Sequence, residues 1–122
     1  MSKEFRELNQ PLLTNTYTTV MVEKEHNFNA PHTFKVVKTE EPDVVVAEIH
    51  FQEGPIKEVG INGVNNEDII AMVIDRLSSF QNSEYSCKEN AMAITKLEEA
   101  ALWLRARTIG REKRAVEGTS IV

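Results

Sequence analysis

The hydrophobic pattern of this chain changes period once, at about residue 64 of 122. Before that point, apolar and polar residues alternate over short runs separated by turn residues such as Glu41-Pro42-Asp43. Two runs, Tyr17–Val22 and His32–Val37, alternate in this way, and a third run, Val44–Phe51, is rich in β-branched residues. A period of two is typical of β-strands that bury one face. We also predict a strand at Ile56–Ile61 and a type I′ turn at Asn62-Gly63, so that the region forms an antiparallel meander.

After this point, apolar residues recur every three or four positions, which predicts two amphipathic helices. Asn65, with Asp68 three positions later, can cap the first helix, which we expect to end between Phe80 and Ser83. The second helix should run from about Ser86 to Arg114. Because the link between the helices is so short, they must pack as an antiparallel hairpin.

The sequence therefore predicts an α+β fold, in which an N-terminal antiparallel β-meander is followed by a two-helix antiparallel hairpin. We expect an N-terminal arm over residues 1–16 and a single domain over 17–122. Within that domain the sheet spans 17–64, the hairpin 65–115 and a tail 116–122. A chain this small buries only about two-thirds of its unfolded surface, so we expect it to oligomerise through the helices.

Charge is concentrated near the end of the second predicted helix. Residues 105–114 hold five cations and one anion, which gives this segment +4 and leaves −9 on the rest of the chain. The cations are Arg105, Arg107, Arg111, Lys113 and Arg114. A local basic site on an acidic body suits a small anion better than duplex nucleic acid, because the acidic remainder repels a long polyanion.

The residue types that carry catalysis or bind metals form no recognisable constellation. The three histidines and the single Cys87 lack the short spacing of zinc ligands, and no glycine-rich phosphate loop is present. Glu98-Glu99 point about 100° apart on a helix and have no nucleophile beside them. No apolar run approaches the roughly 20 residues of a membrane span. We therefore expect neither an enzyme nor a membrane protein, and no metal or cofactor.

The two helices carry the residues that could bind a ligand. Arg107, Arg111 and Arg114 lie at i, i+4 and i+7, so they form one stripe of forked donors suited to phosphate. The same cations also complement the helix dipole, which requires no ligand. Phe80 either packs in the hairpin turn or stacks on a base. Asn90 either reads the edge of a base with its amide or stays solvated.

Several strings in this chain form one long combination. They are Ile49–Gly60, Asn62–Val64, Asn66–Asp68, Cys87–Ala100, Trp103-Leu104, Arg107-Thr108, Arg111-Glu112 and Val116–Thr119. The helical strings resemble the hairpin shared by the phage anti-defence sponges that counter the Thoeris and CBASS defences. The strand strings are similar to the Thoeris anti-defence sponge in particular. The family's tail, Arg-Gly-Val-Glu-Gly-Thr-His, is altered here at Ala115 and Ser120.

The resemblance implies a protein that binds cyclic ADP-ribose isomers made by TIR-domain enzymes and sequesters them from the Thoeris effector without cleaving them. It also implies that some relatives bind cyclic di- and trinucleotides, at sites distinct from the first. On the matching positions, Phe80 would stack on the adenine and Asn90 would hydrogen-bond the ligand. Arg107 and Arg111 would hold the pyrophosphate. The resemblance also implies a homodimer that assembles further into a hexamer, in the cytoplasm of the infected bacterial host.

Helix geometry adds a constraint of its own. Asn90 and Arg107 are 17 positions apart, which is about 26 Å along a continuous helix. One small ligand cannot span that distance, so a pocket that uses both residues must join two subunits. Two other functions compete with ligand capture: a helical hairpin that mediates assembly without a ligand, and a small phage regulator that binds DNA through its basic helix.

Overall fold

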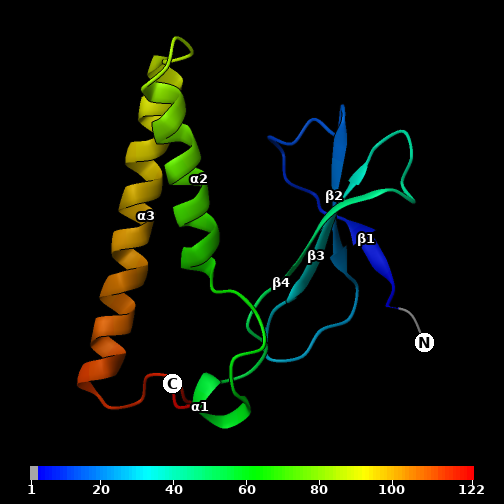
Figure 1. Cartoon of the computed structure of the whole chain (residues 1–122). Helices are drawn as coiled ribbons and strands as arrows, with labels where there is room; N and C mark the ends of the chain where they lie inside the picture. Colours follow the sequence, from blue (N-terminus) through cyan, green and yellow to red (C-terminus); the bar gives the residue numbers. More distant parts are fainter. Residues whose placement is uncertain (1–2) are drawn as a thin grey trace. The chain divides into compact units, whose positions relative to one another are not determined.

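The computed structural model describes residues 3–122, which divide after Val64 into two compact units (Figure 1). The first unit is a four-stranded sheet of order β1-β2-β3-β4, in which every neighbouring pair is antiparallel. Its strands are β1 (Phe5–Glu7), β2 (Thr18–Glu23), β3 (Thr33–Lys38) and β4 (Val45–His50), and a short helix α1 (Ile56–Val59) follows. The second unit is a hairpin of α2 (Asn66–Gln81) and α3 (Lys88–Lys113). The predicted α+β class, a meander followed by helices, is confirmed.

The sheet strands agree closely with the predicted runs. Strands β2, β3 and β4 begin and end within one residue of the predicted runs. Val22 and Val37 are its most buried apolar side chains, with exposed fractions of 1% and 2%. The register between β3 and β4 shifts between Val36 and Val37, which marks a β-bulge.

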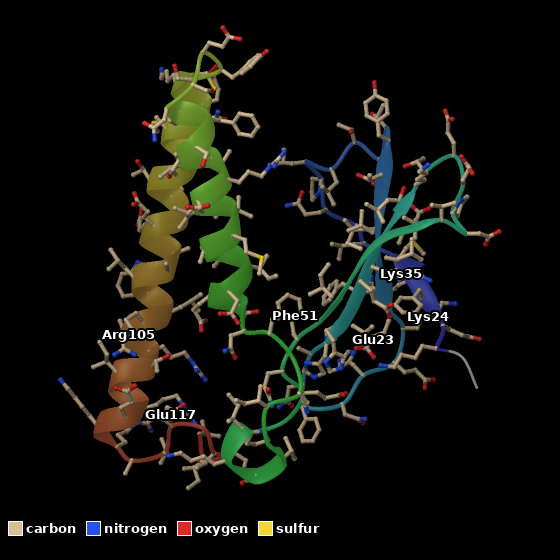
Figure 2. The ribbon with its side chains drawn as sticks, viewed as in Figure 1. Glu23, Lys24, Lys35, Phe51, Arg105 and Glu117 are labelled. Carbon is tan, nitrogen blue, oxygen red and sulfur yellow. The ribbon has the colours of Figure 1, made fainter. Side chains whose placement is uncertain are left out.

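A buried carboxylate on β2 anchors the start of β3. Glu23 accepts hydrogen bonds from the backbone N–H of His32 at 2.6 Å and of Thr33 at 2.7 Å, and Lys3 lies 3.2 Å away (Figure 2). Burial alone would raise the pKa of Glu23. The two backbone N–H groups and the Lys3 ammonium favour the charged form more strongly and lower the pKa from 4.5 to about 2.

The predicted strand at Ile56–Ile61 is wrong, because residues 56–59 form α1 instead. Pro55 precedes this helix and Gly60 ends it with a φ of 79°, donating its N–H to the carbonyl of Ile56 at 2.8 Å. Proline before a helix and glycine after it are the usual boundaries of a helix. These two residues outweighed the β-branched side chains between them.

The predicted type I′ turn at Asn62-Gly63 is also wrong, since neither residue has a positive φ. The Asn62 side chain instead bonds the backbone of Glu53 twice, at 2.8 Å and 2.7 Å. Gly63 is needed for close approach, because a Cβ there would lie 2.5 Å from the carbonyl oxygen of His50. Val64 then pairs with Phe51 at the end of β4.

Part of the predicted N-terminal arm belongs to the sheet. β1 pairs with β2, with Phe5 opposite Glu23, and the Lys35 ammonium lies 4.2 Å from the centre of the Phe5 ring. The first two positions of the predicted arm lie outside the described residues. A three-residue strand is too short to show a period, so the alternation could not reveal it.

The helical hairpin forms as predicted, with boundaries within two residues of those expected. The Asp68 carboxylate accepts the backbone N–H of Asn65 at 2.8 Å, which satisfies one donor at the start of α2. Residues 82–87 connect the helices. Neither α2 nor α3 contains a fully buried residue. The hairpin therefore packs along one seam and lacks a core of its own.

Candidate functional site

The turn of the hairpin is held by reciprocal hydrogen bonds. The Gln81 side chain donates to the Cys87 carbonyl at 3.0 Å and accepts the Cys87 N–H at 3.0 Å. The Cys87 sulfur then accepts the N–H of Asn90 at 3.4 Å and so caps α3. These contacts fix the end of α2 against the start of α3, and they place Phe80 and Asn90 at the same end of the hairpin.

Phe80 lies in a surface pocket of about 500 Å³. The residues that line it are Asp75, Arg76, Ser79, Phe80, Ser83 and Tyr85. Phe80 is 37% exposed, and the guanidinium carbon of Arg76 lies 5.1 Å from the centre of its ring. Such a cation–π contact orients the ring while leaving it within reach of solvent. A half-exposed aromatic ring in a pocket is a suitable platform for stacking a base.

Asn90 is half-buried in the first turn of α3. Its backbone N–H is used in the cap, and across residues 3–122 no hydrogen bond of its side-chain amide is found. An amide carries two donors and one carbonyl acceptor, so it can read the edge of a base or a ribose hydroxyl. The side chain is therefore available for a ligand.

The other end of α3 carries a second pocket, of about 460 Å³. Its lining residues are Ala106, Arg107, Gly110, Arg111, Arg114 and Val122. Three of these are arginines on one helical stripe, as the spacing predicts. Arg105 lies on another face of α3, where it pairs with Glu112 at 3.4 Å (Figure 2). Of the four arginines between 105 and 114, the three on the stripe thus share the pocket.

Arg111 is also engaged by the chain that follows α3. One of its terminal nitrogens, Nη2, donates to the carbonyl oxygens of Val116 at 3.0 Å, Thr119 at 3.2 Å and Ile121 at 2.8 Å. These three acceptors are neutral, so they leave the charge of the Arg111 guanidinium uncompensated. Arg114 donates to the backbone oxygen of Val122 at 2.9 Å. The chain after α3 therefore holds two arginines of the stripe.

The four predicted site residues form two clusters. Phe80 and Asn90 lie at the turn of the hairpin, and Arg107 and Arg111 lie near the opposite end of α3. Because α3 is continuous from Lys88 to Lys113, Asn90 and Arg107 are about 26 Å apart along it. A single chain does not bring the two clusters together.

Arg76 lines the pocket beside Phe80 and was not predicted as a candidate site residue. It precedes Phe80 by four positions on α2, and residues at i and i+4 share one face of a helix. That spacing was a usable signal, because a cation four residues before an exposed ring is positioned to contact it.

Large apolar side chains are exposed on the hairpin outside both pockets. Met72, Leu102 and Trp103 have exposed fractions of 59%, 70% and 72%. Exposed apolar groups of this size on adjacent elements are typical of protein–protein contact surfaces.

Within residues 3–122, we find neither a cluster of metal ligands nor a helix that could cross a membrane. No three residues among the His, Cys, Asp and Glu of this range lie together as metal ligands would. Within the same part of the chain, no helix has the length and apolarity needed to cross a membrane.

Comparison with known proteins places the hairpin in a described family. Residues 43–108 match the family model of the Acb2/Tad1 hairpin domain. A protein of Bacillus phage SBSphiJ7 named Thoeris anti-defense 1 is 49% identical to this chain. That similarity covers 93% of this chain and 97% of the phage protein. The match therefore includes most of the sheet unit and most of the hairpin unit.

Proposed function

This chain belongs to the Thoeris anti-defence sponge family of bacteriophages, and from that premise we propose that it captures a cyclic ADP-ribose isomer and withholds it from the Thoeris effector. The observation that carries the proposal is the pocket lined by Arg107, Arg111 and Arg114. Forked guanidinium groups bind phosphate oxygens with two parallel donors, which suits a pyrophosphate.

The cluster at the turn supplies the complementary chemistry for the nucleoside. Phe80 stacks on the adenine, and Arg76 holds the ring in place from its own position on α2. Asn90 donates to or accepts from the ligand with an amide that has no other described partner. Stacking gives affinity for any base, whereas the amide selects among bases and ribose positions.

The two clusters act together when two copies of the chain pair. A ligand that contacts both Asn90 and Arg107 must lie between the turn of one hairpin and the arginine end of another. Antiparallel α3 helices across a two-fold axis would create two such pockets. The exposed Met72, Leu102 and Trp103 provide apolar surface for such pairing, and the dimers assemble further into a hexamer.

We propose that capture requires no bond cleavage. The proposed ligand contacts are arginines, an amide and an aromatic ring, and none of these is a nucleophile with an adjacent base. The hydroxyls of Ser79 and Ser83, which line the Phe80 pocket, donate to the backbone carbonyls of Asp75 and Phe80 rather than to a base. Affinity alone then lowers the free concentration of the signal in the cytoplasm of the infected host. Cyclic di- and trinucleotides, which the resemblance assigns to a distinct site, are secondary candidate ligands.

A capture-and-release experiment tests this proposal. The purified protein is incubated with a panel of cyclic ADP-ribose isomers and cyclic di- and trinucleotides, washed, heat-denatured, and the released compound identified by mass spectrometry. We expect an intact cyclic ADP-ribose isomer. Release of a linear product would show hydrolysis, and an empty protein from every incubation would contradict the proposal.

The same preparation distinguishes the competing functions. A helical assembly module would oligomerise without retaining any nucleotide. A DNA-binding regulator would bind duplex DNA with an affinity that falls steeply with salt concentration. The net charge of −5 on the whole chain weighs against the regulator, because long-range repulsion opposes its approach to DNA.

A further inference from the structure

The segment after α3 folds back over the last turn of that helix. Ala115 adopts a left-handed φ of 58°, and the Val116 N–H returns to the carbonyl of Arg111 at 3.1 Å. The Thr119 hydroxyl donates to the carbonyl of Val116 at 2.5 Å and accepts the Ile121 N–H at 3.3 Å. We call residues 116–122 the tail; it is an ordered loop with its own hydrogen bonds.

The tail presents three backbone carbonyls to one nitrogen of Arg111. The Nη2 group has two protons, and the carbonyls of Val116, Thr119 and Ile121 lie 2.8–3.2 Å from it. A guanidinium is planar and rigid, so fixing one nitrogen fixes the direction of the other donors. Within residues 3–122, no hydrogen bond from Nε or Nη1 of Arg111 is found.

We propose that the tail is a positioning segment that orients Arg111 for phosphate, an inference that rests on the proposed function. The carbonyls take up Nη2 without neutralising the charge. Both faces of a guanidinium that offer two parallel donors include Nη2, so Arg111 is left to give single charge-assisted hydrogen bonds from Nη1 or Nε to an anion in the pocket that it lines with Arg107. A free arginine side chain must be ordered when its ligand binds. In this chain the Arg111 side chain is already ordered when the chain folds, so ligand binding does not have to order it.

A double-mutant cycle tests whether the tail acts through Arg111. Thr119→Val removes the hydroxyl that shapes the tail. Deletion of residues 121–122 removes the Ile121 carbonyl and also the Val122 oxygen that Arg114 binds, so the deletion is compared with the same deletion in Arg114→Lys. Each change is made in the parent chain, in Arg111→Lys and in Arg107→Lys. Thr95→Val is the matched control, because its hydroxyl donates to the Ala91 carbonyl at 3.1 Å far from the tail.

Calorimetric titration with a cyclic ADP-ribose isomer should give a background-dependent result. We expect either tail change to weaken binding about three- to tenfold in the parent and in Arg107→Lys, and less than about twofold in Arg111→Lys. Thr95→Val should bind as the parent does. Equal weakening in all three backgrounds, unchanged affinity, or tighter binding after the deletion would each overturn the proposal.

Two further measurements separate this inference from the proposed function. In the free protein, the ¹⁵N signals of the Arg111 guanidinium should show slow rotation in the parent and fast rotation in both tail variants. Inorganic pyrophosphate, followed by ³¹P NMR, should bind the parent more tightly than either variant. If the parent binds no cyclic ADP-ribose isomer, the proposed function fails. The positioning role would then be refuted by unchanged guanidinium rotation and an unchanged pyrophosphate titration.

Discussion

A pocket shared between two chains can be rebuilt from two inactive variants. Asn90→Ala removes the amide at the turn, and Arg107→Ala removes an arginine about 26 Å away on the same continuous helix. Each variant alone has no complete pocket, whichever copies pair. In a hybrid dimer, one pocket has lost both residues and the other has kept both. The kept pocket is chemically identical to that of the parent protein.

The expected capacity follows from random pairing. The two variants are mixed in equal amounts, unfolded together and refolded. In half of the pockets, position 90 then comes from the variant that retains Asn90. Independently, in half of the pockets, position 107 comes from the variant that retains Arg107. About one quarter of all pockets should therefore be intact. The fraction is the same for a dimer or a larger ring, because each pocket draws on two chains.

Isothermal titration with a cyclic ADP-ribose isomer measures both capacity and affinity. The mixture should bind with the affinity of the parent and about one quarter of its stoichiometry. The control mixes Asn90→Ala with the double variant Asn90→Ala, Arg107→Ala, in which no pairing restores a pocket. A mixture that binds no more ligand than its separate components would refute a pocket shared between subunits.

Three further predictions concern single side chains. Phe80→Ala should weaken ligand binding about tenfold or more, since stacking contributes roughly 1–3 kcal/mol per base; a lower Tm with unchanged affinity would instead indicate a packing role. Arg107→Lys should leave the Tm nearly unchanged and reduce affinity, because a point charge cannot supply two parallel donors. Arg111→Lys should reduce affinity and also lower the Tm slightly, because it loses the hydrogen bonds to the Val116, Thr119 and Ile121 carbonyls; parental affinity in both variants would exclude a phosphate contact. Glu23, whose pKa falls from 4.5 to about 2 on folding, should contribute roughly 3 kcal/mol of stability above pH 4.5 that is lost as the pH falls toward 2. Urea titrations of Glu23→Gln should show little loss of stability across that range, and an acid dependence like that of the parent would contradict the assignment.

Periodicity predicted the elements of this fold far better than their connections. The strands around Val22 and Val37 and both long helices follow from alternation and from the 3.6-residue repeat. The strand predicted at Ile56–Ile61 was wrong because the β-branched residues of this segment are typical of a strand, whereas Pro55 and Gly60 specify a helical turn. The close approach of the His50 carbonyl to Gly63, which leaves no room for a side chain, produces no pattern in one sequence beyond the glycine itself.

The candidate site was predictable to the extent that it lies on one helix. The spacing of Arg107, Arg111 and Arg114 places them on a single stripe, and all three line one pocket. The contacts of Arg111 with the tail were not predictable, because backbone carbonyls are present at every residue and carry no sequence signature. The roles proposed for Phe80 and Asn90 rest on the resemblance, since the residues alone left two interpretations of each.

Neither long helix contains a fully buried residue, and this makes the stability of the hairpin sensitive to protein concentration. Two helices that bury so little depend on apolar contacts from outside the hairpin. Where a second copy provides those contacts, folding and pairing are linked by mass action, and the unfolding midpoint rises with protein concentration. If binding sites exist only in paired chains, the concentration of these sites then rises more steeply than the total concentration of the protein. Such a protein would bind little ligand while its concentration is low. It would bind ligand efficiently once its concentration is high enough for most chains to pair.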